Sequence, residues 1–167
     1  SAGARKFGAA GDFVTAPEMS AFFGRALARQ VAQVMEASQP SLLEIGAGSG
    51  RLAADLLLEL EALGSLPERY DILDLSADLR ERQQATLAAA APYLLPRVRW
   101  LERLPEAFSG VVVANEVLDA MPAHVVAWRE GGTFERGVGF AETGGFTWQE
   151  RPATGALLAA AGEIGAQ

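Results

Sequence analysis

The sequence predicts an α/β fold, in which helices pack against a mostly parallel sheet. Short apolar segments alternate with helical patterns up to about Pro122, and this alternation is typical of parallel strands joined by right-handed crossovers. The run Val111–Ala114 is continuously apolar and mostly β-branched, as strands inside parallel sheets are. Three closely spaced glycines, Gly46, Gly48 and Gly50, follow the first predicted strand. These observations predict a Rossmann-like arrangement centred on the glycine turn.

The glycine turn is predicted to be a ligand-binding corner. Glycine is needed where the backbone takes a positive φ or where a ligand touches the main chain, and the N-terminus of the following helix favours a bound group. A dinucleotide fingerprint would place its third glycine at Arg51, but here the third glycine is Gly50. The pattern from Glu44 to Gly50 instead resembles motif I of class I S-adenosylmethionine-dependent methyltransferases. The alternative is a structural turn that binds nothing.

The first helix is expected to begin at Thr15, after a glycine-rich segment over residues 1–14. Thr15 and Glu18 form a capping-box pattern, with Pro17 in the first turn. Apolar residues then recur at helical spacing to about Glu36. We therefore expect one helix over this whole range.

The other elements follow from periodicity and from the residues that end them. Gly64 is suited to end the helix after the glycine turn, and Ser76 is suited to cap the next helix. After Ala123, paired glycines separate short strands and predict hairpins. The expected strands cover 41–45, 69–75, 97–101, 111–114, 125–128, 133–140 and 146–150, and the expected helices cover 52–63, 77–91 and 154–164.

The chain is expected to divide into three functional parts. These are a loop and helix that cover the cofactor site over 1–40, a Rossmann-like cofactor-binding core over 41–130, and a hairpin region with the start of a further segment over 131–167. The chain begins with Ser1 rather than Met and stops abruptly at Gln167. We therefore expect a piece of a longer protein, with an incomplete sheet.

Composition bounds the possible functions. Half of the 167 residues are apolar and 21% are charged, as in a globular domain with a substantial core. With no cysteine and a single histidine, His124, we expect no disulfide and no metal site, and we interpret His124 as structural. A net charge of −7 argues against nucleic-acid binding. No apolar run approaches a membrane span, and residues 1–6 lack the apolar region of a secretory signal, so the expected location is the cytoplasm or the mitochondrial matrix.

A carboxylate is expected to bind the ribose of a cofactor at the end of the second strand. Asp74 occupies that place, and Leu75 follows it. The alternative for Asp74 is a solvated charge at a strand end. Asp71 competes for the ribose role, but its position alternates with that of Ile72 along the strand, so we expect it to face away.

Polar residues also follow the fourth predicted strand. Asn115 and Glu116 come directly after it and Asp119 lies three residues further on, at the edge where open α/β sheets bind ligands. If the segment is helical, Glu116 and Asp119 share one face. The alternative is that Asn115 or Asp119 caps a turn that Pro122 ends.

Several blocks together resemble the MidA family of S-adenosylmethionine-dependent methyltransferases of bacteria and mitochondria. The blocks are KFGAAGDFVTAPEMS, LLEIGAGSGRLAADLL, YDILDLSADLRERQ and VVVANEVLDAMPAH. The resemblance implies a class I methyltransferase fold with an added β-hairpin region. For the mitochondrial members, it implies methylation of a protein arginine in a respiratory complex I subunit during assembly.

The resemblance also implies a set of site residues. Asp74 takes the place of the family's strand-two acid, where glutamate is expected, so its reach is shorter. The implied catalytic residues are Glu116 and Asp119. The implied cofactor-binding residues are Phe13, Thr15, Glu44, Gly46, Ala47, Gly48, Gly50, Asp74, Leu75 and Asn115.

The sequence thus predicts a methyltransferase that uses S-adenosylmethionine, releases S-adenosylhomocysteine and acts on a protein arginine. A non-catalytic assembly factor that keeps the cofactor-binding fold is an alternative. A nucleotide-dependent oxidoreductase is a further alternative, disfavoured by Arg51 in place of the third glycine. The expected partner is a protein substrate, and the oligomeric state is open.

Overall fold

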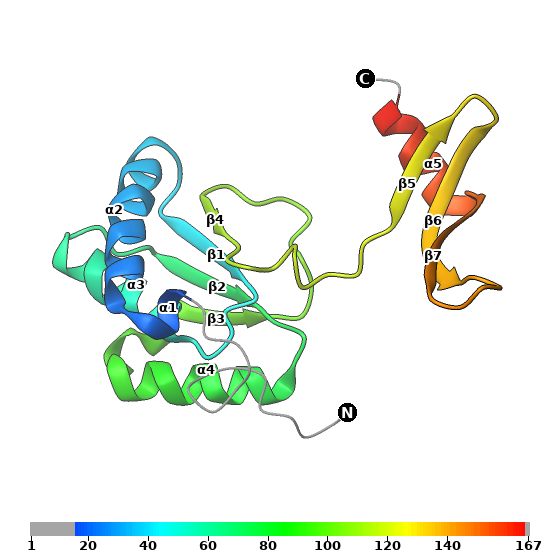
Figure 1. Ribbon diagram of the computed structural model, residues 1–167. Helices are drawn as coiled ribbons and strands as arrows, with labels where there is room; N and C mark the ends of the chain where they lie inside the picture. The colour runs from blue at the N-terminus through cyan, green and yellow to red at the C-terminus, as the bar shows by residue number, and fades with distance from the viewer. Residues whose placement is uncertain (1–15, 166–167) are drawn as a thin grey trace. The chain divides into compact units, whose positions relative to one another are not determined.

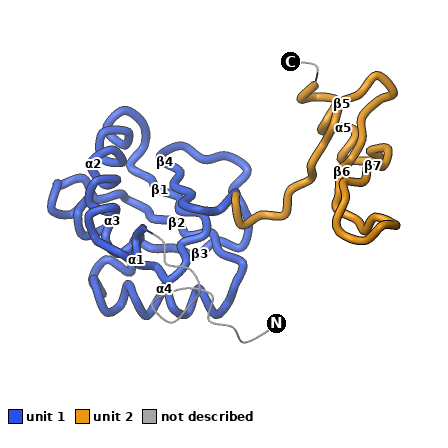
Figure 2. The backbone as a smooth tube through the Cα atoms, viewed as in Figure 1, with its two compact units in different colours: residues 1–118 blue, residues 119–167 orange. Residues whose placement is uncertain are grey.

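The computed structural model describes residues 16–165. The chain forms two compact units, residues 1–118 and residues 119–167 (Figure 2). The expected functional division at residues 40 and 130 stays a prediction. Phe13 and Thr15, which the sequence assigned to the cofactor site, lie outside the described residues.

The first unit contains a four-stranded parallel sheet with the strand order β3-β2-β1-β4 (Figure 1). The sheet confirms the predicted α/β class. Its central strand β1 pairs with β2 on one side and with β4 on the other, and β3 pairs with β2 at the edge. The bounds of these strands are Ser41–Ile45 for β1, Arg69–Leu73 for β2, Val98–Leu101 for β3 and Val111–Val113 for β4.

Helices pack on one face of this sheet, and their apolar side chains form the core together with those of the strands. The helices are α1 (Ala16–Met19), α2 (Ala21–Ala37), α3 (Arg51–Ala62), α4 (Ala77–Ala90) and the 3₁₀ helix η1 (Pro92–Arg97). Alternate strand residues, such as Leu42, Tyr70 and Ile72, enter the core with leucines from α3. Each such apolar side chain contributes about 1.5–3 kcal/mol on burial.

The N-terminal helix is interrupted at Ser20, which corrects the prediction of one continuous helix. Ser20 has an extended backbone, with φ −164°, and its hydroxyl accepts the Phe22 N–H at 3.1 Å. The serine therefore caps the N-terminus of α2 and separates it from α1, because its side chain competes for backbone donors. Two other predicted caps are confirmed: Gly64 ends α3 with φ +69°, and Ser76 accepts the Leu79 N–H at 3.4 Å. The cap predicted at Thr15 lies outside the described residues.

The second unit is an antiparallel sheet with a helix. Strands β5 (Val125–Arg129), β6 (Gly132–Phe140) and β7 (Phe146–Pro152) lie in the order β5-β6-β7, which confirms the predicted hairpins. The helix α5 (Gly155–Gly165) is joined to β5 by a hydrogen bond from Trp128 Nε1 to the Ala161 carbonyl, 3.3 Å long. None of the helices between residues 16 and 165 has both the length and the apolar character to cross a membrane.

Candidate functional site

The glycine turn joins β1 to α3, and its three glycines differ in their surroundings. All have positive φ, at 68° for Gly46, 55° for Gly48 and 83° for Gly50. A Cβ on Gly46 would lie 2.9 Å from Val117 Cγ2, and one on Gly50 would lie 2.8 Å from Gln83 Cα. A Cβ on Gly48 would meet no atom of the described residues within 4 Å. Among the residues that the structure describes, the turn is therefore packed at both ends and open at Gly48.

Backbone and side-chain hydrogen bonds hold this turn in place. The Gly46 N–H donates to the Leu73 carbonyl and the Gly50 N–H donates to the Ala47 carbonyl, both at 2.9 Å. Ser49 accepts the Arg51 N–H at 3.3 Å and donates its hydroxyl to Glu18 of α1. The turn thus lies at the N-terminus of α3, where the helix dipole and backbone donors favour electron-rich ligand groups.

Asp74 lies directly after β2, beside the glycine turn. Its side chain is nearly buried, and both carboxylate oxygens accept protein hydrogen bonds. Oδ1 accepts the Ser76 N–H at 3.1 Å and Oδ2 accepts from Gln83 Nε2 at 2.9 Å. A carboxylate offers about four acceptor positions, so each oxygen keeps one for a ligand.

An open hollow of about 290 Å³ lies next to Asp74. It is lined by Leu75, Ala77, Arg80 and Glu102, and Leu75 is 84% exposed. Arg80 donates to the carbonyls of Asp74 and Leu101, at 2.7 and 2.8 Å, and so ties the ends of β2 and β3 together. Glu102 was not among the predicted site residues, and the signal that could have found it is its position directly after β3.

Asp71 lies on the other face of β2 from the core residue Ile72, which agrees with the prediction that it faces away. It is buried, and it forms ion pairs with Arg69 at 3.0 Å and Arg99 at 2.9 Å. These contacts give Asp71 a structural role in joining β2 to β3.

Glu44 points into the core side of the sheet. Its carboxylate is buried and accepts the Tyr70 hydroxyl at 2.7 Å. Burial raises the pKa of Glu44 to about 7, because desolvation disfavours its charged form, and the Asp74 charge adds to the rise. The hydrogen bond therefore joins β1 to β2 within the core. The cofactor-binding role assigned to Glu44 stays a prediction.

The segment after β4 is irregular over residues 114–120. Glu116 and Asp119 are therefore not helical neighbours, which corrects the conditional expectation that they share a helix face. Glu116 is the one non-glycine among the described residues with a positive φ, at 51°. Such a backbone costs about 1–3 kcal/mol and is often found at functional sites. Asp119 is the first residue of the second unit.

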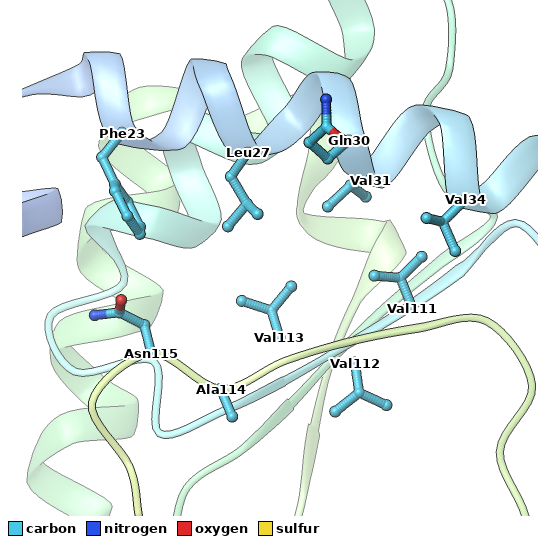
Figure 3. A pocket seen from close by; sticks show the side chains of 10 residues that line it. All are labelled: Phe23, Leu27, Gln30, Val31, Val34, Val111, Val112, Val113, Ala114 and Asn115. Atoms are coloured by element: carbon cyan, nitrogen blue, oxygen red, sulfur yellow. The ribbon is translucent and has the colours of Figure 1, made fainter. Parts of the chain in front are cut away.

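Asn115 lies at the end of an apolar groove between β4 and α2 (Figure 3). The groove has a volume of about 330 Å³. Phe23 and Leu27 project from α2 toward Val113 and Asn115 in the close view (Figure 3). The amide of Asn115 is therefore the polar end of an otherwise mostly apolar surface.

His124 belongs to the second unit and keeps the structural interpretation. Its Nδ1 lies 2.6 Å from Glu135 Oε1, and Arg151 contacts the other oxygen of that carboxylate. These hydrogen bonds lower the pKa of Glu135.

Comparison with known proteins gives one matching family, over residues 26–166. The family is described as “Putative S-adenosyl-L-methionine-dependent methyltransferase”. Curated relatives include the mitochondrial protein arginine methyltransferase NDUFAF7 of rat, 31% identical over 155 residues, and its human counterpart, 30% identical over 155 residues. Each match covers 74% of this chain and 35% of the relative, so the chain spans about a third of the relatives' length.

Two solved structures from Burkholderia thailandensis resemble the chain more strongly. One, bound to S-adenosyl-homocysteine, is 50% identical with a TM-score of 0.77, and the match covers 97% of this chain and 43% of that chain. The other, a native structure from the same superfamily, is 52% identical with a TM-score of 0.71, and covers 93% of this chain and 41% of that one.

Proposed function

The chain belongs to this family of S-adenosyl-L-methionine-dependent methyltransferases, and we propose that it binds S-adenosylmethionine across the carboxyl ends of β1, β2 and β3. We further propose that the intact protein transfers the methyl group to a protein arginine. The observation that supports the cofactor site most directly is the open position at Gly48, next to the preoriented carboxylate of Asp74.

The strand order places the three parts of the proposed site side by side along the sheet. β1, β2 and β3 are adjacent and parallel, so the glycine turn, Asp74 and Glu102 follow one another along one edge of the sheet. In the proposal, the amino-acid end of the cofactor lies at the turn, beside Ala47 and Gly48. Its ribose hydroxyls donate to Asp74, and its adenine lies in the hollow beside Leu75 and Glu102.

The cofactor supplies an activated methyl group on a positively charged sulfur. During transfer, an acceptor nitrogen forms a bond to the methyl carbon, the carbon–sulfur bond breaks, and its electron pair stays on sulfur in S-adenosylhomocysteine. The nitrogen then loses a proton. Protein residues accelerate such a displacement mainly by positioning the acceptor in line and by balancing its charge.

The arginine acceptor is supported by the names of the curated relatives and by the residues after β4. Asn115 and Glu116 lie at the same strand-end edge as the glycine turn, because β4 pairs in parallel with β1. A carboxylate can accept paired hydrogen bonds from a guanidinium and can localise its charge away from the attacking nitrogen. We propose that Glu116 does this, with Asp119 as the second candidate.

Glu116→Gln tests the proposed chemistry in the intact protein. The amide keeps the shape of the side chain but removes its charge, so arginine methylation is expected to slow by roughly a hundredfold or more. The affinity for S-adenosylmethionine is expected to stay within about threefold of wild type. Single-turnover methyl transfer to a partner peptide measures the first quantity, and calorimetry measures the second.

The outcome also separates the alternatives. Transfer at the wild-type rate in the variant would remove Glu116 from the mechanism, and loss of cofactor affinity alone would reassign it to cofactor binding. A wild-type protein that binds S-adenosylhomocysteine but transfers no methyl group to any candidate protein would favour a non-catalytic assembly factor.

A further inference from the structure

Gln83 is a fully buried polar side chain that faces the glycine turn from α4. Its exposed fraction is 0%, and its amide makes three hydrogen bonds. Nε2 donates to the Gly48 carbonyl at 3.1 Å and to Asp74 Oδ2 at 2.9 Å, and Oε1 accepts from Trp100 Nε1 at 3.0 Å. One side chain therefore joins the two parts of the proposed cofactor site, which are distant in sequence.

Trp100 fixes the orientation of this amide. An indole N–H can only donate, so the amide oxygen must face Trp100 on β3. The NH₂ group of Gln83 is then directed at its two acceptors, the Gly48 carbonyl and the Asp74 carboxylate. A glutamate at this position could not satisfy all three contacts when ionised, because it has no proton to donate.

α4 also fixes the position of the turn itself. Thr86, one helical turn after Gln83, donates its hydroxyl to the Ser49 carbonyl at 2.8 Å. The Gln83 backbone lies so close to Gly50 that a Cβ there would approach Gln83 Cα to 2.8 Å. The turn, α4 and the end of β2 therefore form one hydrogen-bonded assembly.

We propose that Gln83 is a positioning residue for cofactor binding, which holds the Asp74 carboxylate and the glycine turn in the arrangement that the cofactor needs. This inference rests on the proposed function, because it concerns the same site. Because Gln83 is fully buried, it acts through Asp74 and the glycine turn rather than by contact with the cofactor. It occupies one acceptor position of Asp74 Oδ2, as the Ser76 N–H does for Oδ1, and so aims the remaining positions at the two ribose hydroxyls.

Gln83→Glu tests this role, with Gln84→Glu as the matched control. The first variant places a carboxyl group at hydrogen-bond distance from Asp74, and two carboxyl groups so close share a proton. The second makes the same chemical change one residue further on, where the side chain is exposed. Two further ionisable groups face Asp74 among the described residues: Glu44, whose pKa the Asp74 charge helps to raise, and Arg80, which donates to the Asp74 carbonyl. Glu44 and Arg80 are unchanged in the wild type and in both variants, so their effect on Asp74 is common to all three proteins.

Calorimetry measures the affinity of each intact variant for S-adenosylhomocysteine from pH 5.5 to pH 8.5. The affinity of each variant is divided by that of wild type at the same pH. At pH 8.5, Gln83→Glu is expected to weaken the binding of S-adenosylhomocysteine by about ten- to a hundredfold. Binding should recover toward wild type as the pH falls, because the shared proton restores a donor. Gln84→Glu is expected to match wild type throughout.

Gln83→Met keeps the inference testable if the glutamate variant does not fold. Methionine preserves the volume but removes the donor, so a loss of about tenfold that does not depend on pH is expected. A folded Gln83→Glu or Gln83→Met protein with wild-type affinity at every pH would overturn the positioning role. A wild-type protein that fails to bind S-adenosylhomocysteine would overturn the proposed function instead, so the two failures are distinguishable.

Discussion

At the residue scale, the carboxylates on β1 and β2 and the one directly after β2 differ in the contacts that their positions allow. Glu44 and Asp71 are buried within the fold and paired with Tyr70, Arg69 and Arg99. Asp74, one residue past the end of β2, keeps acceptor positions on both oxygens. We therefore propose Asp74, at the end of the strand, as the carboxylate that binds a ligand.

The Asp74→Ala variant is expected to bind S-adenosylhomocysteine roughly ten- to a hundredfold more weakly than wild type. Loss of a charged acceptor for two hydroxyls costs about 1.5–3 kcal/mol. Titration calorimetry on the folded variant measures the change. Asp71→Ala is the control: it should lose stability, because Arg69 and Arg99 lose their shared partner, but bind nearly normally once folded. Weaker binding by Asp71→Ala than by Asp74→Ala would contradict the assignment.

At the element scale, α2 and α3 approach closely because Gly24 has no side chain. A Cβ on Gly24 would lie 2.6 Å from Asp55 Cβ, closer than real Cβ contacts allow. The close approach seals the helical side of the core, where Ala28 and Val31 of α2 are buried.

Gly24→Ala is therefore expected to lower the free energy of unfolding by about 1–3 kcal/mol, through overpacking that outweighs the gain in helix propensity. Gly162→Ala in α5 is the matched control, because the same change there meets no described atom within 4 Å. It should be neutral or stabilising by up to about 1 kcal/mol. Urea unfolding measures both, and equal effects of the two substitutions would count against the packing argument.

The elements themselves were largely predictable from local patterns. Periodicity located the strands and helices of the first unit, and Gly64 and Ser76 ended and capped helices as expected. The break at Ser20 was not predicted, because the apolar spacing continues through it. Its signal was Ser20 itself, a residue suited to cap a helix, inside a helical pattern. Apolar spacing does not reveal whether such a side chain binds backbone donors there.

The candidate site was predictable only in part. The glycine spacing and the strand-end acid identify the turn and Asp74 from sequence, because both follow from backbone geometry. Gln83 has no such local signal, since its role depends on how α4 packs against residues distant in sequence. Glu102 has only its position directly after β3 as a signal. The irregular backbone at Glu116 likewise depends on tertiary packing rather than on helical spacing.

At the scale of the whole molecule, burial of Glu44 links stability to pH. Its pKa rises from 4.5 to about 7 on folding, so between these values the folded protein binds more protons than the unfolded chain. The contribution of Glu44 to the free energy of unfolding therefore falls as the pH rises through this window. The full contribution is on the order of 3 kcal/mol.

Glu44→Gln should remove this dependence, because glutamine stays neutral and can still accept the Tyr70 hydroxyl. Urea unfolding of both proteins at intervals from pH 5 to pH 8 measures the difference between their stabilities. The variant is expected to gain relative to wild type as the pH rises. Parallel pH profiles for the two proteins would show that Glu44 does not titrate in this range.

The central claim is that the glycine turn of the first unit holds the cofactor, and binding to wild type and Gly48→Val tests it most directly. A valine there fills the open space beside the turn and costs about 1–2 kcal/mol of backbone strain, so the variant should fold but not bind. Calorimetry with S-adenosylhomocysteine and with NAD, alongside thermal unfolding, is the measurement. Wild type should bind S-adenosylhomocysteine and not NAD, and Gly48→Val should bind neither. Unchanged affinity for S-adenosylhomocysteine in the folded variant would contradict the account.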